Sequence, residues 1–418
     1  MRAQPIITSS LVLLTSLTLN ATDWTQYRGP NQDGLVTEQL KLAWGGAGPK
    51  RVWKATTTDG FSSFVIAGGK VFTVVGRNGQ ETTIALDDKT GKELWATVTG
   101  VVKYQGGGAS GAEDNKGGDG PRSTPSTDGA HVYVYSSSLV LHCLDANTGK
   151  TLWSKDVLAQ HGGKNIAWSS AMSPALDGNN VYVAGGGPGQ AFLAFNKMNG
   201  QVVWKSGNDT ITHASPVVGT IHGVKQVIHF MKSGLVSLNA QTGKELWSFA
   251  FPFKVSTAIS PVICDDMVYC SAGYGVGGGA CKIVKSGNNF SANELWKIVG
   301  DVKVANHWST PVYKDGYLYG MFSFKKWASG PLKCVDVKTG EIKWEKPGFG
   351  AGNALVVGSQ ILALTDDGQL VVAQASPAGY KEVARAKVIS GKCWSTPAVS
   401  NGRIYVRSTK EGVCLDVK

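Results

Sequence analysis

A ten-residue segment that ends in tryptophan recurs along the chain and constrains the fold more than any other feature. It reads LDDKTGKELW at 86–95, LDANTGKTLW at 144–153, LNAQTGKELW at 238–247 and VDVKTGEIKW at 335–344, with a looser copy, FNKMNGQVVW, at 195–204. Each copy places an Asp or Asn and a glycine between two apolar runs, which is the pattern of two strands joined by a tight turn. The Asx side chain accepts hydrogen bonds from the turn, and glycine supplies a positive φ. The segment therefore predicts a hairpin that the fold uses many times.

The tryptophans that end these segments and their looser relatives follow one another at spacings of 42 to 58 residues. An indole combines a large flat apolar face with one N–H donor, which suits a position wedged between neighbouring structural units. We expect a structural role, and no catalytic one, for these tryptophans and for the turn glycines. The residues concerned are Trp53, Trp95, Trp153, Trp204, Trp247, Trp296, Trp344, Gly91, Gly149, Gly200, Gly243 and Gly340.

A second signal lies between the tryptophans: a small residue or proline followed by an alternating apolar run, such as STPSTDGAHVYV and WSTPVYKDGYLYG. It begins near residues 62, 122, 171, 213, 258, 308, 352 and 394. Each unit thus holds four short strands in about 40–50 residues, which is the signature of a β-propeller. The sequence predicts an all-β, eight-bladed propeller of four-stranded antiparallel blades, in which the fifth and seventh units, containing KSGNNFSANELW and ASPAGYKEV, depart from the turn motif.

The two ends of the repeat array predict how the ring closes. Residues 50–56 resemble a fourth strand without a blade of its own, and residues 411–417 resemble a third strand with no fourth strand after it. Pairing these strands would remove the open sheet edges of an unclosed array. We therefore expect the N- and C-terminal strands to complete one blade.

The first residues predict export from the cytoplasm. Arg2, an apolar stretch at 6–19 and the small residue Ala21 have the layout of a signal peptide over 1–21. The stretch is shorter than the roughly 20 residues that span a bilayer, so no transmembrane span is expected. No cysteine follows it, so we expect a periplasmic or secreted protein without a lipid anchor, with an N-terminal extension at 22–49 and the propeller at 50–418.

Charge and cysteine content narrow the range of partners. The net charge is +11, but the basic residues are scattered rather than clustered, so nucleic-acid binding is not expected. The seven cysteines form no CxxC pair, and most lie in strand-like segments where a buried thiol packs as a small apolar group. Cys270 and Cys281, facing each other across a hairpin, are the best candidates for a disulfide. We expect a monomer.

The loops that lead into the first strand of every blade should meet at one mouth of the channel, and in this chain they carry unusual chemistry. Arginine and histidine there could bind an anion or a carboxylate, and tryptophan could stack on a flat ring; simple packing is the alternative. If the mouth binds a ligand, binding should strengthen as the pH falls through about 6.5, where an unperturbed histidine gains charge. The candidate ligand-binding residues are Arg122, Trp168, His213, His307, Trp308 and Trp394.

No catalytic residue or metal site is predicted, because no His, Asp or Glu spacing resembles a ligand set. A glycine-rich insertion at 103–122 borders the same mouth. It could be a lid, a partner-binding loop or a tolerated surface insertion.

The Asp-x-x-Thr-Gly-x-x-x-Trp turn on four-stranded blades resembles the pyrroloquinoline-quinone (PQQ) repeat from about Trp24 to Lys418. That repeat occurs in quinoprotein dehydrogenases and in BamB-type outer-membrane assembly scaffolds. The opening WTQYRGPNQDG is also similar to that of exported bacterial PQQ-like propellers. An enzyme of this kind would hold PQQ and Ca²⁺ at the mouth.

The chain departs from both branches of the resemblance. It lacks the adjacent cysteine pair of the dehydrogenases, a CxxCH haem site and a transferable Glu, Asn and Asp set, and it also lacks the lipid-attachment cysteine of BamB. The resemblance therefore favours a binding or scaffold protein, with partners in the cell envelope or a small acidic or planar ligand. The alternative is a PQQ-dependent alcohol dehydrogenase-like oxidoreductase.

Overall fold

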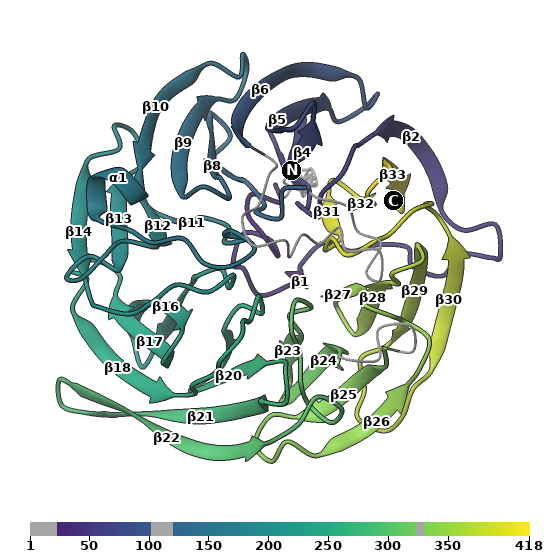
Figure 1. Cartoon of the computed structure of the whole chain (residues 1–418). Helices are drawn as coiled ribbons and strands as arrows, with labels where there is room; N and C mark the ends of the chain where they lie inside the picture. The colour runs from purple at the N-terminus through teal and green to yellow at the C-terminus, as the bar shows by residue number, and fades with distance from the viewer. Residues whose placement is uncertain (1–22, 102–119, 323–329) are drawn as a thin grey trace, which may run out of the picture.

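A computed structural model describes residues 23–101, 120–322 and 330–418, and these form a ring of eight sheets around a central channel (Figure 1). The predicted eight-bladed propeller is confirmed. Within each blade the strands pair antiparallel in sequence order, except in the closing blade, with the first strand nearest the axis and the fourth on the rim. The predicted signal peptide and residues 102–119 of the predicted insertion lie outside the described residues.

The first four blades follow one another directly along the chain. Blade one contains β3 (Val65–Ala67), β4 (Lys70–Arg77), β5 (Gln80–Asp87) and β6 (Glu93–Val101), and blade two contains β7 (Ser126–Thr127), β8 (His131–Tyr135), β9 (Val140–Asp145) and β10 (Thr151–Asp156). Blade three contains β11 (Ala175–Asp177), β12 (Asn180–Ala184), β13 (Phe192–Asn196) and β14 (Val202–Ser206). Blade four contains β15 (Val217–Ile221), β16 (Val224–Met231), β17 (Gly234–Asn239) and β18 (Glu245–Ala250). A short α-helix, α1 (Val157–His161), follows β10.

Blades five to seven continue the same order. Blade five contains β19 (Val262–Cys264), β20 (Met267–Ala272), β21 (Gly277–Ser286) and β22 (Asn289–Ile298). Blade six contains β23 (Val312–Lys314), β24 (Tyr317–Met321), β25 (Leu332–Asp336) and β26 (Ile342–Lys346). Blade seven contains β27 (Asn353–Val357), β28 (Gln360–Leu364), β29 (Gln369–Gln374) and β30 (Glu382–Lys387). No helix in the described ranges is long and apolar enough to cross a membrane.

The eighth blade closes the ring with strands from both ends of the chain. It contains β31 (Ala398–Ser400), β32 (Arg403–Arg407), β33 (Glu411–Asp416) and, on the rim, β2 (Lys50–Thr56). β2 and β33 pair antiparallel from Lys50 opposite Asp416 to Thr56 opposite Glu411. The predicted closure is therefore confirmed, and no strand edge of the ring is left open between the first and last blades.

The repeated turn joins each blade to the one before it. The indole N–H of Trp53, Trp95, Trp153, Trp204 or Trp296 donates to a carbonyl in the turn of the following blade, at 2.8 to 3.2 Å. The turn glycines adopt φ of +68 to +73°. A Cβ on any of them would lie within 2.5 to 2.9 Å of the tryptophan ring of the preceding blade. Glycine is thus required twice, by the backbone conformation and by the face-on contact with the indole.

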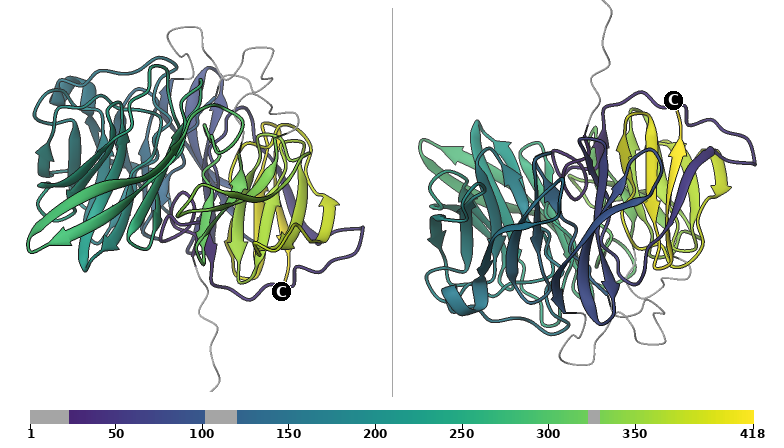
Figure 2. Two further views of the ribbon diagram at one scale, coloured as in Figure 1. Left: turned by 90° about the horizontal axis from the view of Figure 1, so that it is seen from below. Right: turned by 90° about the horizontal axis from the view of Figure 1, so that it is seen from above.

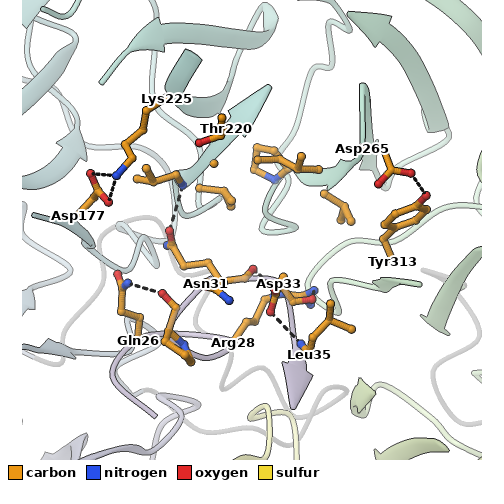
Figure 3. A pocket seen from close by; sticks show the side chains of 18 of the residues that line it. Gln26, Arg28, Asn31, Asp33, Leu35, Asp177, Thr220, Lys225, Asp265 and Tyr313 are labelled. Atoms are coloured by element: carbon orange, nitrogen blue, oxygen red, sulfur yellow. Dashed lines mark hydrogen bonds and ion pairs between the residues drawn. The ribbon is translucent and has the colours of Figure 1, made fainter. Parts of the chain in front are cut away.

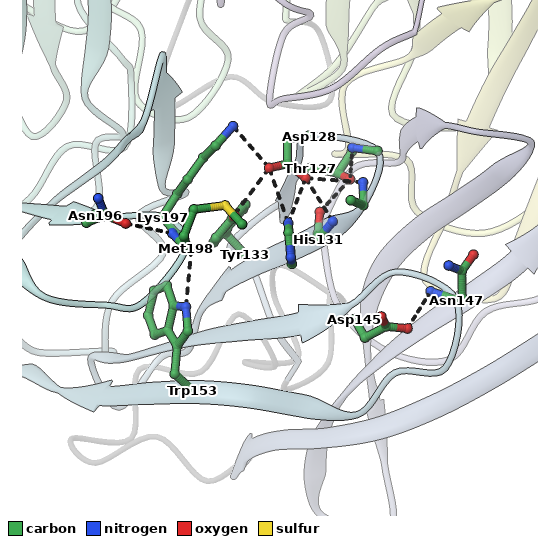
Figure 4. A network of polar contacts seen from close by, with 12 residues as sticks. Thr127, Asp128, His131, Tyr133, Asp145, Asn147, Trp153, Asn196, Lys197 and Met198 are labelled. Carbon is green, nitrogen blue, oxygen red and sulfur yellow. Dashed lines mark hydrogen bonds and ion pairs between the residues drawn. The ribbon is translucent and has the colours of Figure 1, made fainter.

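The junction between blades two and three shows how polar groups in the turns support this contact (Figure 4). Trp153 donates its indole N–H to the Lys197 carbonyl at 3.2 Å. The ammonium group of the same Lys197 lies 3.1 Å from the Asp128 carboxylate, which also accepts the His131 backbone N–H at 2.8 Å. These partners lower the pKa of Asp128 against the opposing effect of its partial burial. One lysine therefore contributes both its carbonyl and its charge to the seam.

The two degenerate blades change their junctions in a way that follows from the missing motif. Blade five replaces the Thr-Gly turn with the longer β21–β22 hairpin, and Trp247 of blade four donates to the Gln226 side chain of its own blade at 2.7 Å. At blade seven, Trp344 of blade six donates instead to the Ser376 carbonyl at 2.7 Å. The indole donor thus keeps a partner in both blades although the turn is absent.

All seven cysteines are buried and unpaired. The predicted Cys270–Cys281 disulfide is wrong, because the β20–β21 register sets Cys281 opposite Val268 and Cys270 opposite Gly279. The two cysteines are therefore diagonal neighbours, which lie about 7–8 Å apart in a sheet, too far for the Cα separation of a disulfide.

Residues 23–36, here called the N-terminal strap, cross the channel (Figures 1 and 2). At one end Trp24 and Ile66 of β3 exchange two backbone hydrogen bonds of 2.9 and 2.8 Å. At the other end β1 (Leu35–Val36) pairs in parallel with β27. The strap contacts the first strands and the prolines of their Ser-Pro starts, so it lies further along the channel than the mouth residues, which precede those prolines.

Candidate functional site at the channel mouth

The structure brings the six predicted mouth residues together from five blades. Arg122 donates to the Trp168 carbonyl at 2.6 Å, and the Trp168 ring centroid lies 6.3 Å from that of His213. On the other side, Trp308 lies 4.9 Å from both the His307 and the Trp394 rings. The two groups are close enough for His307 to influence the pKa of His213. Their role in ligand binding remains a prediction.

A stack of aromatic rings runs along one side of the mouth. Trp394 stacks on Trp308 with centroids 4.9 Å apart and planes at 22°, and on Phe61 at 5.0 Å and 24°. The Lys392 ammonium lies 4.4 Å from the Trp394 ring centroid, a cation–π distance. Three groups of the protein itself therefore contact the Trp394 ring.

Sequence reasoning missed Phe61, Lys392 and Tyr274, whose ring lies edge-on to His307 at 5.2 Å. A signal for Phe61 was present, because FSSF at 61–64 occupies the repeat position of WSTP at 308–311 and at 394–397. The phenylalanine was overlooked because its start lacks proline. Lys392 and Tyr274 stand outside that repeat position, and only the fold brings them to the mouth.

The two mouth histidines are uncharged at neutral pH. Burial, together with the nearby Arg122 and His307, lowers the pKa of His213 to about 3. Burial likewise lowers the pKa of His307 to about 3. The expectation that these histidines gain charge as the pH falls through about 6.5 is therefore wrong. The physical reason is that their rings lie in the protein interior, where the charged form loses its hydration.

The backbone at the mouth holds two consecutive residues in the left-handed region. Trp168 has φ of +65° and Ser169 has φ of +56°. Non-glycine residues in this region cost about 1–3 kcal/mol each and persist where the surrounding structure holds them. Here the Trp168 carbonyl accepts from Arg122. The arginine thus fixes an unusual turn that presents the indole to His213.

Two buried polar atoms at the mouth have no hydrogen-bond partner among the described residues: Nδ1 of His213 and Nε1 of Trp394. Such atoms cost roughly 1–3 kcal/mol when they are left without a partner. The indole N–H can only donate, whereas the neutral imidazole nitrogen can donate or accept. Together they could receive a small group that offers a hydrogen-bond acceptor.

The residues present do not fit PQQ together with Ca²⁺. Within 23–101, 120–322 and 330–418, no three His, Cys, Asp or Glu side chains gather so that they could hold a metal ion. The side chains at the mouth are aromatic, basic or neutral imidazole, whereas Ca²⁺ takes oxygen ligands such as carboxylates. A flat ring could meet the aromatic wall, but the described residues supply no acidic set for the metal beside it.

Comparison with known proteins identifies the family of the chain. The family model described as outer membrane protein assembly factor BamB matches residues 85–346 and 328–415. The chain belongs to this BamB family. BamB of Yersinia pestis is 21% identical over 290 residues, which cover 68% of this chain and 70% of that protein. Tetrathionate hydrolase of Acidithiobacillus ferrooxidans is 25% identical over 276 residues, which cover 66% of this chain and 46% of the hydrolase.

Solved structures share the propeller of this BamB-family chain. BamB of Moraxella catarrhalis matches with a TM-score of 0.60 at 16% identity, covering 89% of this chain and 98% of that one. Quinohemoprotein alcohol dehydrogenase of Comamonas testosteroni matches with a TM-score of 0.64 at 14% identity, covering 94% and 80%. At such identities the likeness shows the fold alone, and it does not separate a scaffold from an enzyme.

Proposed function

We propose that this chain is a binding scaffold of the cell envelope that holds a protein partner and does not carry out quinone-dependent oxidation. The observation that carries the proposal is the mouth itself. Its central ring, Trp394, stacks on both Trp308 and Phe61, and no acidic ligand set accompanies it among the described residues. The site is built as a packed aromatic wall, which supports a structural role there.

Membership of the BamB family supports the same proposal, because relatives in it are named as outer membrane protein assembly factors. We propose that this chain is exported and meets its partner in the envelope. Its net charge of +11 favours acidic partner surfaces or anionic envelope polymers. We propose that the chain is a monomer and that its complex in the envelope forms with this protein partner.

The competing function is that of a PQQ-dependent dehydrogenase, and it is tested by titration. We expect no one-to-one binding when purified residues 22–418 are titrated calorimetrically with PQQ at micromolar concentration in the presence of Ca²⁺. We also expect no alcohol-dependent dye reduction above a protein-free control. Saturable PQQ binding that is lost in Trp394→Ala, together with dye reduction, would contradict the scaffold function and support a PQQ-dependent dehydrogenase.

A further inference from the structure

A cavity of about 620 Å³ lies beside the N-terminal strap, against the first strands of blades three to six (Figure 3). Its size falls within the range of about 300–1,000 Å³ that ligand pockets occupy. It is lined on one side by strap residues such as Asn31 and Asp33, and on the other by Val218, Ile263 and Tyr313. The mouth cluster takes no part in it.

The strap shows what this channel surface binds. The first strand of each blade has one edge that is not paired with its own sheet, and the strap bonds to that edge in several blades. In blade three, Gln26 accepts the Leu176 N–H at 2.6 Å and donates to the Leu176 carbonyl at 3.2 Å. In blade four, Gln32 accepts the Val218 N–H at 3.1 Å and donates to the Pro216 carbonyl at 2.9 Å.

The main chain of the strap makes the same kind of contact elsewhere. Trp24 pairs with Ile66 in blade one, the Thr25 carbonyl accepts the Thr127 N–H in blade two, and the Gly34 carbonyl accepts the Val356 N–H in blade seven. A carboxamide side chain and a peptide backbone are thus interchangeable partners for this edge. Both present one donor and one acceptor in the geometry that a strand edge requires.

In blade five, which lines the cavity, the strap leaves this edge uncovered. Ile263 of β19 stands at the repeat position of Leu176 and Val218. Its neighbours in β19 are Val262, opposite Tyr269, and Cys264, opposite Met267 across the two-residue turn. As in blade four, the backbone N–H of the middle residue faces the channel. No strap residue in the described chain bonds to it, and the half-buried Ile263 lines the cavity instead.

The charges around the cavity favour neutral or basic ligands. Lys225 is paired with Asp177 at 2.8 Å and Lys314 with Asp315 at 3.0 Å, so neither lysine offers a free positive charge. The Asp33 carboxylate accepts the Leu35 N–H at 2.9 Å and is not paired with a lysine. The buried Arg28 guanidinium also lines the cavity and offsets part of the Asp33 charge, but it already donates to the carbonyls of Gln32, Asp33, Thr310 and Pro311. An acidic ligand would therefore find no free cation to pair with among the described residues that line the cavity.

We propose that the cavity binds an extended peptide segment of a partner protein, which pairs its backbone or an Asn or Gln carboxamide with the free edge of β19 at Ile263. The peptide is neutral or basic. Its contact with blade five repeats what Gln26 and Gln32 do in blades three and four, as strand addition does at other exposed sheet edges. The inference rests on the proposed function, since it assigns a docking site for the protein partner of the scaffold.

The experiment measures binding of a fluorescent probe, fluorescein-labelled Ala-Val-Gln-Val-Ala-amide, to purified residues 22–418 by fluorescence polarisation. We expect a dissociation constant below 1 mM. Methylation of the Gln backbone nitrogen should weaken binding by at least tenfold, because it removes the donor that pairs with the strand. Replacement of Gln by Glu should weaken it by a similar factor, because it removes the amide donor and adds a charge beside Asp33.

Two protein variants locate the site. Ile263→Pro removes the channel-facing N–H together with the isoleucine side chain, at a position where an edge strand tolerates proline, and should weaken probe binding at least tenfold. Thr220→Trp places a large ring at the exposed side of the cavity and should also abolish binding, whereas Thr151→Trp, on the rim strand β10, should leave it unchanged. If Ile263→Pro does not fold, Thr220→Trp and the methylated probe decide the matter.

Absence of binding at 1 mM, or equal binding to wild type, Thr220→Trp and a folded Ile263→Pro, overturns the inference. The proposed function fails separately. A protein partner that copurifies equally with wild type and Thr220→Trp leaves the scaffold standing without this docking site. If no envelope partner copurifies with the protein, the proposed scaffold function is contradicted as well.

Discussion

Replacement of Arg407 by methionine is expected to lower the free energy of unfolding by about 4 kcal/mol, because several buried acceptors lose their partner at roughly 1–3 kcal/mol each. Arg407 lies in β32 of the closing blade and is 1% exposed. Its guanidinium donates to the carbonyls of Ser62 and Val74, both at 2.8 Å, and to the Thr73 hydroxyl at 2.7 Å. It also donates to the Thr58 and Asp59 carbonyls in the segment that joins β2 to β3.

The seam between the last and first blades therefore depends on one side chain. Methionine has a similar length but donates no hydrogen bond, so several buried acceptors would lose their partner. The matched control is Arg403→Met in the same strand, where Arg403 donates to the Asp88 carbonyl at 2.9 Å from a less buried position. Urea denaturation should show a loss of less than about 1 kcal/mol for the control, the range for exposed charge contacts. Equal losses would show that Arg407 does not hold the seam.

Gly243→Val is expected to cost about 3 kcal/mol, from backbone strain together with overpacking. Gly243 has φ of +70°, a region in which β-branched residues are strained. A Cβ at this position would also lie 2.5 Å from the Trp204 ring of the preceding blade. The valine would therefore disturb both the turn and the junction with blade three.

Lys244→Val is the matched control, because Lys244 is the exposed neighbour of Gly243 in the same turn and lies outside the indole contact. Its melting temperature should stay close to that of the wild type, whereas that of Gly243→Val should fall by several degrees. Identical melting temperatures for the two variants would contradict the role assigned to the turn.

The number of blades and the closure of the ring could be predicted because the evidence for them is local and repeated. An Asp or Asn, a glycine and a tryptophan at fixed offsets define a hairpin wherever they occur, and the unmatched strands at 50–56 and 411–417 had one plausible partner each. The Cys270–Cys281 pairing failed for the opposite reason. It depended on the register of one hairpin, and a shift of two residues separates the cysteines.

The strap and the charge state of the mouth could not be predicted from the sequence. Gln26 and Gln32 bond to strands roughly 150 and 186 positions away, and nothing local distinguishes them from surface glutamines. Likewise, nothing in the sequence distinguishes His213 and His307 from exposed histidines. Only the fold shows that both are buried, which lowers their pKa values. The repeat position did place Arg122, Trp308 and Trp394 at one mouth, because all first strands run in the same direction along the axis.

The most direct test of the scaffold is the stoichiometry of the protein in its own envelope. The tagged full chain would be cross-linked in cells, purified under denaturing conditions and quantified by mass spectrometry, beside an Arg122→Ala/Trp394→Ala variant. We predict one envelope protein in near-equimolar yield with both forms, because partner binding does not use the mouth. Recovery of the chain alone, or loss of the partner in the mouth variant, would contradict the account.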